Sequence, residues 1–290
     1  MGRSRLLITL MLLLTGRTVS AQSLQPIPFT LLESGHIIMR ATFDGVTGNF
    51  IFDTGGGHNL LFDRFAEQLG KSHKTHHFFT AHRATGEALT VPVYEIDSLR
   101  IGNLVLTSQV YSTFDMDIEG IDGILSLQPF EHTPVTIDFE NRTLSFDPLT
   151  EAQKQAFIDI QVADYAGKAL DIFTNVRVND TLTIQVLLDS GAGNGSFWFS
   201  TRLMDALKLN KNTFEETERQ SEFDAGRIDR FYRGPLQALA TEGGQVRLQN
   251  FSALFVDGLI YEGKTGIDWL GKQITISIPD RRIYLLAIKK

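Results

Sequence analysis

Short apolar runs separated by turn-forming residues recur along the chain, and this pattern predicts β-strands joined by tight turns. Residues 39–55, MRATFDGVTGNFIFDTG, have two such runs around the Asp-Gly pair at 44–45. Residues 175–191, NVRVNDTLTIQVLLDSG, have two around the Asn-Asp pair at 179–180. Both pairs tolerate the left-handed backbone of tight turns. The second run of each stretch is apolar up to a terminal acid, which predicts a strand buried on both faces.

These two stretches are copies of one pattern, because residues 39–55 align with residues 175–191 without a gap. The two copies continue to match after the acid. Residues 62–70 and 199–209 each predict a short amphipathic helix with an i, i+4 apolar pair. Those pairs are Phe65 with Leu69 and Leu203 with Leu207. The chain therefore contains an internal repeat.

A third matched piece closes each copy of the repeat. Residues 120–130, GIDGILSLQPF, precede a predicted hairpin at 135–146, and residues 265–271, TGIDWLG, precede one at 274–286. Each piece has a glycine inside an apolar segment. The glycines are Gly123 and Gly266, and the hairpins are expected to turn at 140–142 and near 279–281. Matching order over three elements excludes chance similarity as the explanation.

The repeat predicts an all-β fold with two lobes of similar plan and a few short helices. Two equivalent lobes pack most simply about a pseudo-twofold axis, as symmetric subunits do. We expect the N-terminal lobe over residues 22–150 and the C-terminal lobe over residues 165–290. The proline and polar helix formers of DPLTEAQKQAF, 147–157, predict a surface linker, which we place at 151–164.

The N-terminus predicts a secretory signal peptide over residues 1–21. Arg3 and Arg5 precede an apolar run from Leu6 to Leu14, and Val19-Ser20-Ala21 resembles a cleavage site. An uncleaved anchor is the alternative, but the run is well short of the ~20 residues that a spanning helix needs. We therefore expect a periplasmic or secreted protein with no membrane contact after signal cleavage.

Composition narrows the classes of partner. The 290 residues are 42% hydrophobic, which is enough for a large core, and the net charge is −7 without a dense Lys/Arg cluster, so we expect no nucleic acid partner. The sequence has no cysteine, so an exported form has no disulfides, and a bacterial periplasm or the medium fits best. We expect a monomer.

The two acids at the ends of the matched strands are Asp53 and Asp189. If equivalent loops meet at the pseudo-twofold axis, these carboxyl groups face each other and share one proton, because two close carboxylates do not both ionise cheaply. The charged acid then takes a proton from a water while the protonated acid donates to a carbonyl oxygen, which hydrolyses an amide without a covalent intermediate. The glycines two residues on, Gly55 and Gly191, allow tight turns and close approach to the carboxylates.

Asp53-Thr54-Gly55 and Asp189-Ser190-Gly191 resemble the paired Asp-Thr/Ser-Gly signatures of the aspartic proteases. The chain is similar to the two-lobed pepsin–retropepsin superfamily, especially its small bacterial retropepsin-like members, over most of its length after the signal peptide. The resemblance implies two β-barrel-like lobes, the dyad Asp53/Asp189, and neither cofactor nor metal. It also implies that the Thr54 and Ser190 hydroxyls brace the two loops across the lobe interface.

The resemblance further implies loop-packing glycines and flap hairpins over the cleft. Gly123 and Gly266 would mark the segments that pack against the catalytic loops. We expect one flap at 82–88, HRATGEA, with its tip at Thr85-Gly86, and a second within 222–231, EFDAGRIDRF, around Ala225-Gly226. Glycine within a β-patterned segment suits a mobile cover.

The sequence departs from the family pattern in three places. Gly56 follows the first triplet where the family usually has Ser, Thr or Ala. Asp122 and Thr265 precede Gly123 and Gly266, where two apolar residues are usual. Segment 82–88 lacks the flap tyrosine of the pepsin branch. These differences bear on catalytic efficiency more than on the fold.

Other readings of the same residues are weaker. GAGNG, 191–195, lacks the G-x-G-x-x-G spacing of a dinucleotide loop, and its counterpart at 55–57 explains it better. The histidines His73, His76, His77 and His82 are irregularly spaced, which favours a solvated loop over a zinc site. No serine has the G-x-S-x-G setting of a serine hydrolase.

The sequence thus predicts an exported aspartic endopeptidase that binds an extended peptide or protein substrate between its lobes. Two alternatives stay open. One is a peptide- or ligand-binding protein on the same scaffold that has weak or no turnover. The other is a hydrolase for a non-peptide amide or ester.

Overall fold

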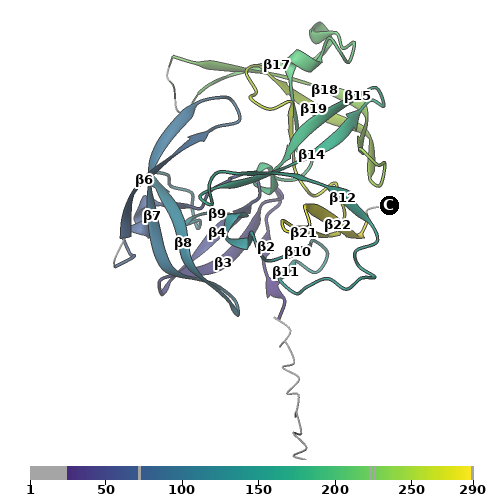
Figure 1. Ribbon diagram of the computed structural model, residues 1–290. Coiled ribbons are helices and arrows are strands. Elements are labelled where there is room, and N and C mark those ends of the chain that lie inside the picture. The colour runs from purple at the N-terminus through teal and green to yellow at the C-terminus, as the bar shows by residue number, and fades with distance from the viewer. Residues whose placement is uncertain (1–24, 71–72, 222–223, 225, 289–290) are drawn as a thin grey trace, which may run out of the picture.

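The computed structural model describes residues 25–70, 73–221, 224 and 226–288 (Figure 1). The expected signal peptide at 1–21 lies outside the described residues. Within the described residues, no helix has the length and apolarity needed to cross a membrane. The structure is nearly all β and has two lobes, which confirms the predicted fold class.

The N-terminal lobe is built on an eight-stranded sheet with the order β2-β3-β4-β9-β5-β8-β7-β6. Its strands are β2 (Thr30–Leu31), β3 (Ile37–Phe43), β4 (Val46–Asp53), β5 (Leu60–Phe62), β6 (His73–His82), β7 (Ala88–Ile101), β8 (Leu104–Phe114) and β9 (Gly123–Ser126). An additional pairing of β3 with β7 curls the sheet toward a closed barrel.

The C-terminal lobe repeats this topology strand for strand in the order β13-β14-β15-β20-β16-β19-β18-β17, with an additional β14–β18 pairing. Its strands are β13 (Gln161–Asp164), β14 (Leu170–Val178), β15 (Leu182–Leu188), β16 (Phe197–Ser200), β17 (Glu215–Gln220), β18 (Ile228–Thr241), β19 (Arg247–Val256) and β20 (Gly263–Thr265). The predicted duplication is therefore present in the fold as well as in the sequence.

A third sheet joins the lobes, in the order β1-β11-β10-β21-β22-β12. Its strands are β1 (Ile27–Pro28), β10 (Val135–Asp138), β11 (Thr143–Ser145), β12 (Phe157–Asp159), β21 (Gln273–Ser277) and β22 (Arg282–Ala287). The predicted terminal hairpins pair with each other at its centre, where the buried hydroxyls of Thr136 and Thr275 are 2.7 Å apart. Figure 1 shows this sheet where the purple-to-blue and green-to-yellow lobes meet.

Two of these strands fall inside the segment expected to be a linker, 151–164. β12 pairs with β22 and β13 pairs with β14, so the second half of this segment belongs to the sheets. The polar composition of 147–157 indicates an exposed crossing between the lobes, but it carries no signal for the pairing of the residues that follow.

The helices are shorter than the predicted segments. Within 62–70 the α-helix is α1 (Asp63–Ala66), and within 199–209 there is a 3₁₀ turn, η3 (Thr201–Leu203). The remaining 3₁₀ turns are η1 (Gln128–Phe130), η2 (Ser190–Ala192) and η4 (Lys211–Thr213). Phe65, Leu69 and Leu207 are buried as the i, i+4 pattern predicts. That pattern reports which face meets the core, not how many turns are helical.

The turn residues act as their chemistry predicts. Asp44, Asn179 and Asp180 have φ values of 43°, 48° and 58°, in the left-handed region. Arg142 and Arg281, in the two terminal hairpins, have φ values of 54° and 52°. These turns fix the strand register, and register decides which side chains enter the core.

Alternating burial along the strands builds the core. In β3 every second residue from Ile37 to Phe43 is buried. Phe43, Phe50 and Phe65 pack within 4.8–6.0 Å of one another, two of the three pairs edge to face. This packing anchors β4, the strand that ends at Asp53.

Candidate active site

The two predicted acids lie together where the lobes meet. Asp53 ends β4, and Asp189 directly follows β15. The Asp53 Oδ1 atom accepts hydrogen bonds from the backbone N–H of Gly55 at 2.9 Å and of Gly191 at 3.3 Å. Since Gly191 belongs to the other lobe, each lobe contributes to the setting of the same carboxylate.

The glycine of each triplet makes this approach possible. A Cβ atom added at Gly55 would lie 2.6 Å from the Asp189 Cγ atom, which is closer than Cβ contacts occur. A Cβ atom added at Gly191 would collide with the Asp53 carboxyl group. Each glycine therefore lets its lobe's backbone pass directly beside the acid of the other lobe.

The residues between acid and glycine tie the two loops together. The Thr54 N–H donates to Ser190 Oγ, and the Ser190 N–H donates to Thr54 Oγ1, each at 3.0 Å. The Thr54 hydroxyl also donates to the Leu188 carbonyl, and the Ser190 hydroxyl donates to the Phe52 carbonyl, each at 2.7 Å. All four bonds cross between the lobes in a buried setting, so the loops are held as one unit.

The two acids are in different electrostatic states. Desolvation and then the neighbouring Asp189 raise the pKa of Asp53 well above its ordinary value. Burial alone would raise the pKa of Asp189 too, but the Lys264 ammonium and hydrogen bonding outweigh it, and the pKa of Asp189 is lowered. These opposite directions favour one shared proton held on the Asp53 side of the pair.

Lys264, on β20, was not anticipated from the sequence. Its Nζ atom is 2.7 Å from Asp189 Oδ2, and its side chain is 13% exposed. A signal was available, because Lys264 stands two residues before the matched Gly266 and close to the second triplet's partner segment. Apolar patterning alone does not say that such a residue faces a carboxylate.

A third acid, Asp171 on β14, lies close by and was also missed. Its side chain is buried, and its Oδ1 atom lacks a hydrogen-bond partner among the described residues. Burial and the nearby Asp189 raise the pKa of Asp171 to about 7. The acid is therefore an additional titrating group behind the dyad.

The strand register shows that Gly123 and Gly266, which the sequence pattern matched as loop-packing glycines, are not at equivalent positions. Gly123 pairs with Phe50, three residues before Asp53, and Gly263 pairs with Val186, three residues before Asp189. Gly123 therefore corresponds to Gly263. A Cβ atom added at Gly123 would strike the Leu60 carbonyl of β5, a strand contact that does not involve the loop of Asp53.

Ser126 stands in the N-terminal lobe where Gly266 stands in the C-terminal lobe. Ser126 pairs with Asp53, and the residue before Gly266, Thr265, accepts the Asp189 N–H at 2.8 Å. Gly266 does pack on the loop that follows Asp189, since an added Cβ would lie 2.7 Å from the Gly193 carbonyl oxygen. Both segments have a glycine in a similar setting. The sequence pattern therefore did not show that Gly266 lies three residues beyond the position equivalent to Gly123.

The first flap candidate forms a hairpin between β6 and β7 that reaches the other lobe. Thr85 is buried near its tip, and Gly86 has a φ of 98°. The Ile260 N–H of the C-terminal lobe donates to the Ala84 carbonyl at 3.0 Å, and Arg227 donates to the Thr85 carbonyl. The flap is therefore docked over the cleft.

Glu87 is the centre of this docking. Its carboxylate accepts hydrogen bonds from Ser221 at 2.6 Å and from Thr85 at 2.5 Å, and Arg227 lies 3.9 Å away. Partial burial acts to raise the pKa of Glu87, but these hydrogen bonds and then Arg227 lower it to about 2. We call Glu87, Thr85, Ser221 and Arg227 the flap latch.

The second flap candidate is only partly described. Ala225 lies outside the described residues, while Gly226 is exposed between β17 and β18. The next residue, Arg227, belongs to the flap latch. Of the described residues of this segment, Asp229 and Phe231 line the cleft.

The remaining sequence candidates do not form a metal centre. Gly56 is exposed beside Asp53, and His76, His77 and His82 are exposed on β6. Across residues 25–70, 73–221, 224 and 226–288, no cluster of three or more His, Asp or Glu side chains has metal-binding geometry.

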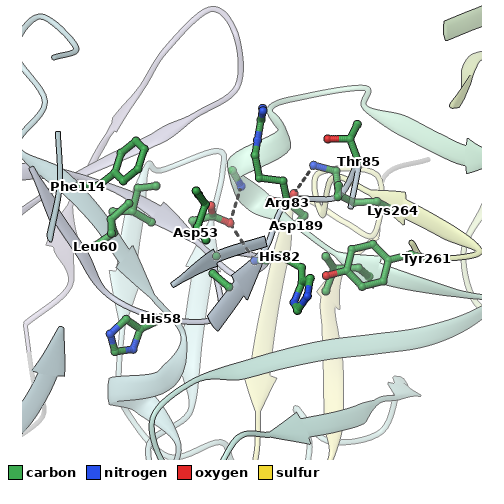
Figure 2. A pocket seen from close by; sticks show the side chains of 18 of the residues that line it. Asp53, His58, Leu60, His82, Arg83, Thr85, Phe114, Asp189, Tyr261 and Lys264 are labelled. Carbon is green, nitrogen blue, oxygen red and sulfur yellow. Dashed lines mark hydrogen bonds and ion pairs between the residues drawn. The ribbon is translucent and has the colours of Figure 1, made fainter. Parts of the chain in front are cut away.

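A cleft of about 500 Å³ runs beneath the flap and over both acids. Much of its lining is apolar, with Asp53, Asp189 and Lys264 at the floor (Figure 2). The apolar lining residues include Leu60, Phe79, Leu89, Val91, Phe114, Ile124, Leu187, Trp198 and Phe231. An apolar cleft with a few convergent polar groups is the usual form of a small-ligand or peptide site.

Comparisons with known proteins agree with this geometry. Residues 39–128, which include the first triplet, match a family model described as aspartyl protease. The structure matches the crystal structure of an aspartic proteinase from Irpex lacteus with a TM-score of 0.55 and 12% sequence identity, over 91% of this chain and 97% of that chain. Comparison with curated proteins gave no significant match. The chain therefore has the two-lobed fold of an aspartic proteinase, and residues 39–128 of its N-terminal lobe are similar to the aspartyl protease family.

Proposed function

We propose that this protein is an exported aspartic endopeptidase whose catalytic residues are Asp53 and Asp189. The observation that carries the proposal is the meeting of both acids at the floor of one cleft, cross-braced by Thr54 and Ser190. Neither lobe builds this arrangement alone. The retained pair of acids in unequal protonation states suits acid–base hydrolysis.

The chemistry follows from the unequal states of the acids. The Asp189 carboxylate takes a proton from a water molecule as the water oxygen bonds to the peptide carbonyl carbon. Asp53 gives its proton to the carbonyl oxygen, which yields a neutral tetrahedral diol. Asp189 then gives the proton that it took from the water to the amide nitrogen, the C–N bond breaks, and the products are a carboxyl group and an amine. The Asp53 proton is restored from the diol hydroxyl.

The substrate is an extended peptide or protein segment. An extended chain fits between the flap and the acids, and its backbone groups can pair with the flap strand as an added β-strand does. The apolar lining offers places for apolar side chains on both sides of the scissile bond. The N-terminal residues 1–21, as a cleavable signal, would deliver this activity as a monomer to the periplasm or the medium.

A cleavage assay tests this proposal. The wild type, Asp53→Asn and Asp189→Asn are incubated with a mixed peptide library from acidic to neutral pH, and products are identified by mass spectrometry. We expect cleavage by the wild type and none by either variant, with inhibition by a pepstatin-like compound. If all three folded proteins are equally inert, the enzyme proposal fails. If one variant alone loses activity, the shared dyad is wrong.

The alternative is a peptide-binding protein without turnover. The Lys264–Asp189 ion pair favours it, because the ammonium group occupies a carboxylate oxygen that could otherwise serve the water. This alternative predicts that the wild type and both Asn variants bind peptides from the library, as measured by calorimetry, and that none of them cleaves.

A further inference from the structure

The structure breaks the symmetry of the dyad at one pair of equivalent positions. Ile124 pairs with Ile51, two residues before Asp53, and Lys264 pairs with Leu187, two residues before Asp189. Ile124 and Lys264 are therefore related by the pseudo-twofold axis, and both line the cleft. One acid has an isoleucine at this position where the other has a lysine.

The contacts show that each residue stands beside its own acid. The Lys264 Nζ atom lies 2.7 Å from Asp189 Oδ2 and 4.6 Å from the centre of the Trp198 ring. On the other side, a Cβ atom added at Gly56 would lie 3.1 Å from Asp53 Oδ2 and 3.3 Å from Ile124 Cγ2, so the isoleucine methyl group lies near the Asp53 carboxyl. The scaffold is duplicated, but the charge beside the acids is not.

Other charged groups near Asp189 do not explain the same asymmetry. Asp171 on β14 and Tyr261 after β19 face it, and as an acid and a phenol they do not stabilise its negative charge electrostatically. Arg227, which directly precedes β18, is engaged with Asp229 at 2.7 Å. Lys264, on β20, is the cation in direct contact with the dyad among residues the structure describes.

We propose that Lys264 is a positioning residue for the dyad. Lys264 holds Asp189 as the carboxylate, so that the single proton of the pair stays on Asp53. It also shifts the pH range over which the pair carries one proton toward lower pH. The catalytic part of this inference rests on the proposed endopeptidase function. The physical reason is that a nearby cation favours every deprotonated form of the pair. In contrast, Ile124 leaves Asp53 without a compensating charge.

The first test is the pH profile of kcat/KM. In Lys264→Met we expect both limbs of the profile to move to higher pH by roughly 1–3 units, the usual effect of one neighbouring charge. Lys264→Arg should restore the wild-type limbs. Lys272→Met is the matched control, because Lys272 makes an exposed ion pair with Glu140 at 2.5 Å and lies outside the site. Unmoved limbs in a folded, active Lys264→Met protein would overturn the proposal.

The second test does not require activity, so it separates failure of this inference from failure of the endopeptidase proposal. The carboxyl carbons of Asp53 and Asp189 are titrated by NMR in protein labelled with ¹³C-aspartate, and they are assigned with the two Asn variants. In the wild type, Asp189 should ionise at lower pH than Asp53. If Asp53 ionises first, the proposal is overturned whether or not the protein cleaves peptides and whether or not a Lys264 variant folds.

A position swap gives the sharpest readout. The double variant Ile124→Lys with Lys264→Ile keeps the composition and net charge but moves the cation from one acid to the other. We expect the order of ionisation to reverse, so that Asp53 ionises first. An unchanged order in the folded double variant would show that Lys264 does not decide where the proton resides.

Discussion

Thr54 and Ser190, one from each lobe, exchange backbone-to-side-chain hydrogen bonds in both directions at 3.0 Å. Each hydroxyl also donates a hydrogen bond across the interface to a backbone carbonyl oxygen of the opposite lobe. The exchange is closed, buried and nearly symmetric. These hydrogen bonds hold the loops of the two lobes together, so that Asp53 and Asp189 lie in one site.

Thr54→Val tests the strength of this exchange. The Ser190 N–H loses its buried acceptor, and an unmet buried donor costs about 1–3 kcal/mol, so the free energy of unfolding should fall by that amount in urea titration. Thr42→Val is the control, because the Thr42 hydroxyl makes its bond to Thr47 at 2.8 Å on the exposed surface. Equal losses in the two variants would show that the cross-brace adds nothing.

Glu87→Gln should release the flap latch. Because the pKa of Glu87 is lowered to about 2, its stabilisation is present above the unfolded value of 4.5 and is lost as pH falls toward 2. The Ile260 N–H, which donates to the flap, reports docking through hydrogen exchange. Its protection, corrected for intrinsic exchange, should fall between pH 5 and 2 in the wild type.

In Glu87→Gln the protection of the Ile260 amide should be low throughout this range. Glu151→Gln is the control, because the Glu151 side chain is 90% exposed and lies between β11 and β12, outside the flap hairpin. A Glu87→Gln protein with wild-type protection at every pH would contradict the latch.

Asp171→Asn should remove a loss of stability that the wild type shows as pH rises, whereas the stabilisation by Glu87 is lost as pH falls. The pKa of Asp171 is raised to about 7 from 3.8, so the wild type loses stability as pH rises through this interval, where the buried carboxyl must ionise. The variant should lack that loss, and its melting temperature should exceed the wild-type value most clearly above pH 7. A constant difference from pH 4 to pH 8 would show that ionisation of Asp171 is not responsible.

Gly123→Ala and Gly266→Ala should both destabilise the fold, because the added methyl group meets backbone carbonyl oxygens of Leu60 and Gly193. Overpacking of this kind costs about 1–3 kcal/mol. Gly70→Ala is the control, since nothing lies within 4 Å of its added Cβ. If Gly266→Ala unfolds at the same urea concentration as Gly70→Ala, the close packing of Gly266 against the loop of Asp189 is contradicted.

Local patterning determined much of the architecture. The duplicated strand–turn–strand units, the left-handed turns at Asp44 and Asn179, and the meeting of Asp53 with Asp189 all follow from short-range features repeated at matched positions. A turn residue or an apolar run acts over a few neighbours, so its effect can be read from the sequence. Duplication then supplies the one long-range relationship, because equivalent loops meet at a pseudo-twofold axis.

Other features depended on register between distant strands. The equivalence of Gly123 with Gly263, and the place of Ser126 opposite Asp53, follow from the pairing of β9 with β4 and of β20 with β15. A shift of a few residues between similar apolar-glycine segments leaves the sequence pattern almost unchanged. The pairing energy of whole strands decides the register, and it is a property of the assembled sheet.

The sequence by itself thus determined the two-lobed β fold and the pair of acids, because both are written in local, repeated patterns. Only the tertiary structure decided the electrostatics around those acids. Lys264, Asp171 and Glu87 come from different strands or turns, and their effects depend on distances of a few ångströms to groups far away in the chain. Burial and proximity set those charges, and neither exists before the lobes have folded together.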